Sequence, residues 1–248
     1  HILACRPATS DHPSQFPAAL QPDGIILTPP HSDNAQIVAL LAAQNIPFVR
    51  IGSEDMTPGI PVSMDDEGSA RQATQHLLSK GHKRIGFIAG SAEYNLSGWR
   101  VDGWRSAMAE AGCAVDGLLV EGDFSYASGQ AAAHTLLAQP QRPTAIIASN
   151  DQMALATLEV AGKIGLSVPE DLSLISFDNT PLVHFTRPPL TAVDQPIAMT
   201  ASRAVELIIA AQRGDDPPAK LTLVSATLVE RGSVAVPAEV DPVAHARG

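Results

Sequence analysis

The hydrophobic positions of the chain fall into short uninterrupted runs, and longer segments with helical spacing of apolar residues separate these runs. The run 85–89 is apolar throughout, which is typical of a parallel strand that helices cover on both faces. Strands are predicted at residues 2–5, 24–28, 47–51, 60–64, 85–89, 118–120, 144–148, 172–177, 190–193 and 221–228. Helices are predicted at residues 33–44, with Asp33 or Asn34 as the cap, and at 67–79, 98–111, 125–138, 151–164 and 196–209.

Strands and helices alternate regularly between residues 67 and 178, as four successive βα units. This order predicts a parallel sheet with helices on both faces. The first sixty or so residues form a second βα set. We therefore predict an α/β protein with two lobes, an architecture that binding proteins use to close around small ligands.

Polar side chains follow each strand of the second set. In chain order they are Ser97 and Arg100; Glu121 and Asp123, with the aromatic Phe124; Asn150 and Asp151; and Asp178 and Asn179. All of them fall at the carboxyl ends of strands, where open α/β sheets bind their ligands. Carboxylates, an amide and a guanidinium form hydrogen bonds with vicinal hydroxyls, and a flat ring can cover the apolar face of a sugar. The set therefore favours a polyhydroxylated ligand.

Each of these residues also has a local explanation. Asn150 or Asp151 can cap the helix that starts there, and Asp178 can stabilise a turn with Asn179. Phe124 can pack in the core, and Arg100 can pair with Asp102 or another acid. Local explanations account less easily for the convergence of all these residues at strand ends.

Composition limits the functions open to this chain of 248 residues. Its net charge of −10 argues against a grip on nucleic acid, although a segment outside the chain could still bind DNA. Cys5 and Cys113 form no metal pattern and fit a reducing compartment, and no apolar run approaches the length of a membrane span. The acids at 65–67 are more typical of a helix start than of a metal site. The chain lacks a nucleophile elbow, a phosphate loop and H-E-x-x-H. We therefore expect no enzymatic activity, cofactor, metal or membrane partner.

Five motifs, taken together and in order, resemble the effector-binding domain of the LacI/GalR family of bacterial transcription regulators. They are G-H-K-R-I-G-F-I-A-G at 81–90, R-V-D-G-W at 100–104, S-N-D-Q-M-A at 149–154, L-I-S-F-D-N at 174–179 and P-L-T-A-V-D-Q-P at 189–196. The resemblance extends from residue 2 to residue 232. It implies a two-lobed periplasmic-binding-protein-like fold of type I, each lobe a parallel sheet flanked by helices. The lobes are expected at 1–66 plus 196–224 and at 67–195 plus 225–236, with a tail at 237–248.

The resemblance also implies a cytoplasmic repressor that acts as a homodimer. A small carbohydrate would bind between the lobes and change the operator affinity of an amino-terminal helix-turn-helix that lies outside this chain. Arg100, Phe124, Asn150 and Asp178 match effector contacts of the family, and Asp65 matches a contact that some members use.

The chain departs from the family pattern at its amino-terminal end. Residues 2–5 resemble the second strand of the family, so we expect its first strand and helix to lie outside this chain. Asp194 stands where a basic or neutral residue is common. A secreted sugar-binding protein of a transporter, which has the same fold, stays open as an alternative that the upstream coding sequence would distinguish. A sugar-modifying enzyme is a weaker one.

Overall fold

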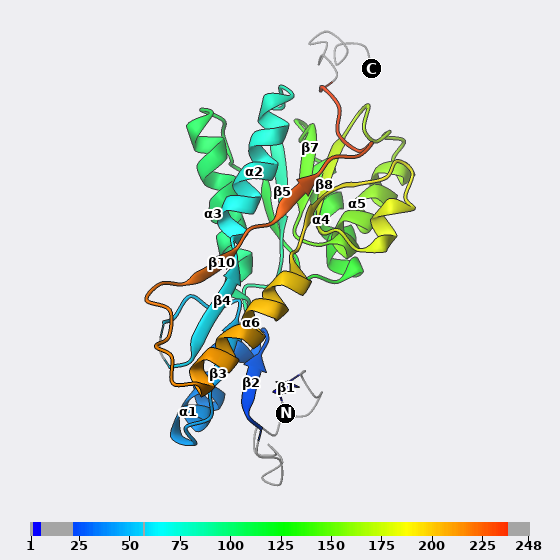
Figure 1. Cartoon of the computed structure of the whole chain (residues 1–248). Coiled ribbons are helices and arrows are strands. Elements are labelled where there is room, and N and C mark those ends of the chain that lie inside the picture. Colours follow the sequence, from blue (N-terminus) through cyan, green and yellow to red (C-terminus); the bar gives the residue numbers. More distant parts are fainter. Residues whose placement is uncertain (1, 6–21, 57, 238–248) are drawn as a thin grey trace, which may run out of the picture. The chain divides into compact units, whose positions relative to one another are not determined.

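The computed structural model describes residues 2–5, 22–56 and 58–237, with only the backbone of 2–5. The chain divides into two compact units. Unit 1 comprises residues 1–66, 93–96 and 196–226, and unit 2 comprises 67–92, 97–195 and 227–248. Figure 1 shows a sheet with flanking helices in each unit.

Unit 1 contains, in its described residues, a parallel sheet with the strand order β1-β2-β3-β4-β10. Successive residues of β2 point to opposite faces of this sheet. Ile25 packs with Val38 and Leu41 of α1 on one face, and Ile26 packs with Leu207 and other residues of α6 on the other. The elements are β1 Ile2–Cys5, β2 Gly24–Leu27, η1 His31–Asp33, α1 Ala35–Ala43, β3 Phe48–Ile51, β4 Ile60–Met64, α6 Ile197–Gln212 and β10 Thr222–Val224.

Unit 2 contains a sheet with the strand order β11-β9-β8-β7-β5-β6. Phe87 of β5 packs against Trp104 of α3, with ring centroids 5.6 Å apart. The next residue, Ile88, belongs to a core cluster with α4 and α5 on the opposite face. The elements are α2 Asp66–Ser79, β5 Ile85–Ala89, α3 Asn95–Glu110, β6 Leu119–Glu121, α4 Tyr126–Leu137, β7 Ala145–Ala148, α5 Asp151–Lys163, β8 Ser173–Asp178, η2 Pro181–His184, β9 Thr191–Asp194 and β11 Thr227–Val229.

The prediction of a single strand at 221–228 is wrong, because the structure has two short strands there. β10 pairs parallel to β4 in unit 1, whereas β11 pairs antiparallel to β9 in unit 2. The chain passes from one unit to the other after Ala226, so each half of the run finds its own partner. β9 leaves unit 2 near Asp194 and β11 re-enters opposite that residue, so β11 runs back along β9. The unit 2 sheet is therefore parallel except at this edge.

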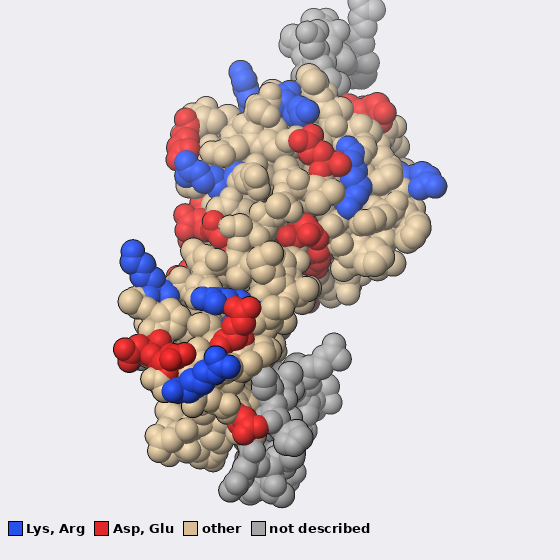
Figure 2. Space-filling model, in the orientation of Figure 1, with Lys and Arg blue, Asp and Glu red and all other residues tan. Residues whose placement is uncertain are grey.

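Charged side chains are interspersed on the face that Figure 2 shows, and neither sign forms a continuous surface among the residues described there. No helix within residues 22–56 and 58–237 combines the length and the apolar character needed to cross a membrane.

Candidate functional site

Arg100 is fixed inside unit 2 at the carboxyl end of its sheet. Its side chain, carried by α3, is only 2% exposed. Nη1 donates a hydrogen bond of 2.6 Å to the backbone oxygen of Ser149, and the guanidinium carbon lies 4.4 Å from the centroid of the Phe177 ring. The carboxylate of Asp102 lies 3.9 Å from Arg105 on the exposed side of α3. Arg100 is therefore a buried cation that β7 and β8 hold in place.

Asn150 caps α5 and at the same time holds the loop that carries Phe124. Its Oδ1 accepts a hydrogen bond of 2.9 Å from the backbone nitrogen of Met153. Its Nδ2 donates one of 2.8 Å to the backbone oxygen of Phe124. The capping role considered from the sequence is thus correct, and the second contact ties α5 to the loop after β6.

Phe124 has a left-handed backbone, with φ of +70°. Its ring lies directly over Gly90, because a Cβ built on Gly90 would lie only 1.9 Å from the Cζ atom of Phe124. A residue with a side chain could not occupy position 90 with the ring in this place. The loop after β5 and the loop after β6 therefore meet at the Phe124 ring.

Asp178 ends β8 in a left-handed turn, with φ of +94° for Asp178 and +59° for Asn179. Gln195 Nε2 donates a hydrogen bond of 2.6 Å to Asp178 Oδ1. Burial raises the pKa of Asp178; the positive charge of Arg100 opposes this shift, and the negative charge of Asp151 adds to it. The carboxylate thus lies in a partly desolvated setting with one cation and one anion near it.

The backbone of this turn is held by other side chains. Asp151 Oδ2 accepts a hydrogen bond of 2.7 Å from the backbone nitrogen of Thr180. Asn179 Nδ2 donates one of 2.8 Å to Asp194 Oδ1, and Arg231 donates one of 2.6 Å to Asn179 Oδ1. The turn considered from the sequence is therefore present, and Asp194, which had no explanation from the sequence, anchors it to the end of β9.

Several buried oxygens around these residues have no hydrogen-bond partner among the described residues. In unit 2 they are the hydroxyls of Ser97, Ser149, Ser176 and Thr180 and the Oδ1 atom of Asp151. Buried polar atoms are usually satisfied, because an unmet hydrogen bond is costly in a low dielectric. These oxygens can each form a further hydrogen bond, and they lie at the same strand ends as Arg100 and Asp178.

Four of the five residues assigned from the sequence therefore share one region of unit 2. Arg100 contacts the residue before Asn150, Asn150 contacts Phe124, and Arg100 acts electrostatically on Asp178. Asp65 belongs to unit 1, where its backbone nitrogen donates to Val224.

The sequence analysis missed two residues of this region. Gln195 lies two residues after the predicted strand 190–193, so the signal that marked the other residues could have marked it as well. Phe177 lies inside an apolar run, and nothing in the sequence distinguishes it from core. Its contact with Arg100 is visible only in the folded chain.

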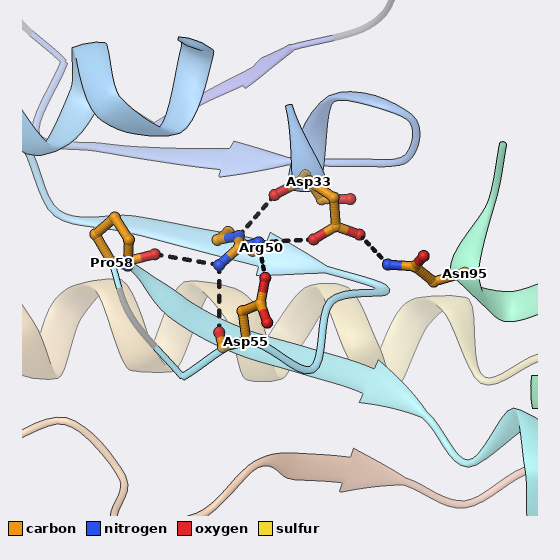
Figure 3. A network of polar contacts seen from close by, with 6 residues as sticks. Asp33, Arg50, Asp55, Pro58 and Asn95 are labelled. Atoms are coloured by element: carbon orange, nitrogen blue, oxygen red, sulfur yellow. Dashed lines mark hydrogen bonds and ion pairs between the residues drawn. The ribbon is translucent and has the colours of Figure 1, made fainter. Parts of the chain in front are cut away.

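A separate polar network lies in unit 1 around Arg50, which is 3% exposed (Figure 3). Its guanidinium donates to the backbone oxygen of Ser32 and to Asp33 Oδ1, both at 2.6 Å, and to the backbone oxygen of Asp55 at 3.2 Å. Asp33 Oδ2 accepts a hydrogen bond of 2.7 Å from Asn95. Asn34, and not Asp33, caps α1. Asp33 instead binds Arg50, and this contact links the loop after β2 to the loop after β3.

The residues that the structure describes include no cluster of three or more His, Cys, Asp or Glu side chains placed to hold a metal ion. The acidic residues at 65–67 instead lie at the start of α2, which begins at Asp66. A negatively charged residue at a helix amino terminus is favourable because the backbone N–H groups there are unpaired.

Comparisons with known proteins identify the family. The family model for the periplasmic binding protein-like domain matches residues 74–234. The chain is 32% identical to a regulatory protein of the LacI family from Chloroflexus aggregans, with a TM-score of 0.80 over 86% of this chain and 77% of that one. The chain belongs to the LacI/GalR family of transcription regulators. Membership in the LacI/GalR family, with the two sheets described above, confirms the predicted fold class.

Two further LacI/GalR proteins bear on function. The chain is 38% identical to the catabolite control protein A of Priestia megaterium over 191 residues, which is 76% of this chain and 57% of that protein. The chain therefore spans little more than half of that relative. It is also 32% identical to the transcriptional regulator CelR, solved as a complex with cellobiose, with a TM-score of 0.79 over 86% of this chain and 66% of that one.

Proposed function

We propose that this chain is the effector-binding portion of a LacI-type repressor and that its effector is a small carbohydrate. The observation that carries the proposal is the convergence of Arg100, Phe124, Asn150 and Asp178 at the carboxyl ends of the unit 2 strands. Each comes from a different element, and hydrogen bonds hold all four of them, from Arg100 to Ser149, from Asn150 to Phe124 and from Gln195 to Asp178.

Each residue has a role in this proposal that follows from its chemistry. Asp178 accepts hydrogen bonds from sugar hydroxyls, and the guanidinium of Arg100 donates to hydroxyl oxygens. The ring of Phe124 covers an apolar face of the sugar. Asn150 positions Phe124 and offers its amide, and Asp65 is proposed as a further effector contact. Hydrogen bonds to charged groups contribute roughly 1.5–3 kcal/mol each, so a few of them support micromolar affinity.

A carbohydrate is favoured over other small molecules for two reasons. The side chains are those that pair with vicinal hydroxyls, and the solved CelR complex contains cellobiose. CelR is a separate protein, so its ligand supports the class of effector for this chain and leaves the particular sugar to experiment.

We further propose that the protein acts in the cytoplasm as a homodimer and binds operator DNA through an amino-terminal helix-turn-helix outside this chain. The relatives that match are named as transcription regulators. An effector shifts such a regulator between two states only by the difference in its affinity for them. Sugar binding would thus change operator affinity without any chemical step, and we propose no enzymatic activity.

The alternative is a sugar-binding protein that serves a transporter, since the matching domain family is described as periplasmic binding protein-like. The coding sequence upstream of His1 distinguishes the two. A helix-turn-helix there supports the regulator, and a cleavable apolar leader supports the transport protein.

A thermal-shift screen tests the proposal. The probes are monosaccharides and disaccharides including cellobiose, with nucleosides and amino acids for comparison. A sugar present at 100 times its Kd should add about 2.7 kcal/mol of stability. Asp178→Asn should abolish this shift, while the same change at the exposed Asp102 should leave it intact. If no sugar raises Tm, or if Asp178→Asn responds like the wild type, the proposal is wrong.

A further inference from the structure

The carboxylate of Asp178 is held by a side chain from a different strand end. Gln195 directly follows β9, and its Nε2 donates to Asp178 Oδ1 at 2.6 Å. A hydrogen bond donated to a carboxylate oxygen favours the ionised form of the group. An amide can donate to this carboxylate without adding a charge, which a lysine or arginine at the same place would do.

The hydrogen bond from Gln195 is separate from the contacts that hold the backbone of the turn. Asp194, Arg231 and Asp151 hold Asn179 and Thr180, and none of these contacts uses Gln195. The left-handed turn can therefore keep its shape when Gln195 is replaced. The replacement removes only the hydrogen bond to the carboxylate of Asp178.

Charged groups from several elements surround this turn. Arg100 from α3 favours the ionised form of Asp178, whereas Asp151 from α5 disfavours it. Asp194 at the end of β9 and Arg231 after β11 face the neighbouring Asn179, and His184 of η2 lies 2.9 Å from Arg231. A neutral donor that hydrogen-bonds to the ionised carboxylate adds to the effect of Arg100.

We propose that Gln195 is a positioning residue for effector binding, which keeps the carboxylate of Asp178 ionised and aimed in one direction. Gln195 acts through Asp178 and needs no contact of its own with the effector. The inference rests on the proposed function only in that Asp178 is taken to meet the effector; the link between Gln195 and Asp178 can be measured without any ligand.

The test compares three variants with the wild-type protein. Gln195→Leu removes the donor at similar size, and Gln195→Glu places a second carboxyl group against Asp178. Gln141→Leu is the matched control, because Gln141 is exposed in the loop before β7, away from the carboxyl end of that strand. The first readout is the pKa of the Asp178 carboxyl, followed by carbon-13 NMR. The second is the affinity for cellobiose, or for the sugar found in the screen, as a function of pH.

The pKa of Asp178 should rise in Gln195→Leu, because the ionised form loses a hydrogen bond. It should rise further in Gln195→Glu, because two adjacent carboxyl groups share a proton. Sugar affinity at pH 7 should fall about tenfold or more in Gln195→Leu, and the pH at which affinity is lost should move upward. Gln141→Leu should change neither quantity.

The possible results separate the inference from the proposed function. An unchanged pKa of Asp178 in both Gln195 variants overturns the inference, whatever the sugar does. A raised pKa with unchanged sugar affinity and pH profile also overturns it, since Gln195 would then affect the ionisation of Asp178 without affecting effector binding. If the wild type binds no sugar, the proposed function fails, and the NMR titration still decides whether Gln195 controls Asp178.

Discussion

Replacing Gly90 with alanine tests where the Phe124 ring lies. A Cβ at position 90 would lie 1.9 Å from Phe124 Cζ and 2.2 Å from Cε1. Carbon atoms in ordinary contact are about 3.5–4.0 Å apart, so the ring would have to withdraw by roughly 2 Å. Its backbone cannot easily follow, because the carbonyl of Phe124 accepts a hydrogen bond of 2.8 Å from Asn150. Overpacking of this kind destabilises a protein by about 1–3 kcal/mol.

Urea unfolding followed by tryptophan fluorescence measures this effect. The two tryptophans of the chain, Trp99 and Trp104, both lie in α3, so the signal reports on unit 2. Gly98→Ala is the matched control, because a Cβ there meets nothing within 4 Å. Gly98 lies within α3, where an alanine is about 0.5–1 kcal/mol more favourable than a glycine. The same substitution should therefore destabilise at position 90 and stabilise at position 98.

A double-mutant cycle identifies the cause. If the Phe124 ring is what the new methyl group meets, Gly90→Ala should cost almost nothing once Phe124→Ala has removed the ring. A cost that persists in the absence of the ring would show that the methyl group meets something else, and a Gly90→Ala protein as stable as the wild type would show that the ring does not lie over Gly90. Sugar affinity of Gly90→Ala should also fall, since the displaced ring would no longer cover the ligand.

Two further predictions concern stability. Burial lowers the pKa of His82, whose neutral ring donates to Ala235 O and accepts from Thr144. The unfolded chain therefore binds a proton at His82 more tightly than the folded chain does, so the free energy of unfolding should be intact above pH 6.5 and fall as the pH drops below it. Urea unfolding at pH 7.5 and 5.5 should show that His82→Gln loses less of this free energy than the wild type. An equal loss in both proteins would contradict this. Arg50→Met should destabilise unit 1 by roughly 3 kcal/mol, because it leaves Asp33 and buried carbonyl groups without their donor. Hydrogen exchange of β2 and β3 should quicken in Arg50→Met but stay unchanged in the exposed control Arg203→Met, and equal protection in both variants would show that the network is dispensable.

Much of the fold could be predicted from the spacing of apolar residues. The uninterrupted runs became the parallel strands of the two sheets because burial on both faces demands such runs. The run 221–228 was the exception, since no glycine or proline marks the break at Ser225 and Ala226. That break exists because the chain changes units there, which is a property of the tertiary structure that local sequence does not carry.

The candidate site was predictable in position but not in detail. Asn150 and Asp178 could be found because the carboxyl ends of parallel strands meet at one edge of a sheet. Their partners could not, because the Asp178–Gln195 contact depends on the register between β8 and β9. Likewise, the contact between Arg100 and the Phe177 ring depends on which face of β8 the ring occupies. Asp194 looked anomalous in the sequence and acquires a role only once Asn179 lies beside it.

A crystal structure of the protein with its sugar is the most direct test of effector binding by these residues. Sugar hydroxyls should lie within about 3.2 Å of the Arg100 guanidinium and the Asp178 carboxylate, with the Phe124 ring against the sugar. A sugar bound in another place, with Asp178 still in contact only with protein groups, would overturn the proposed site.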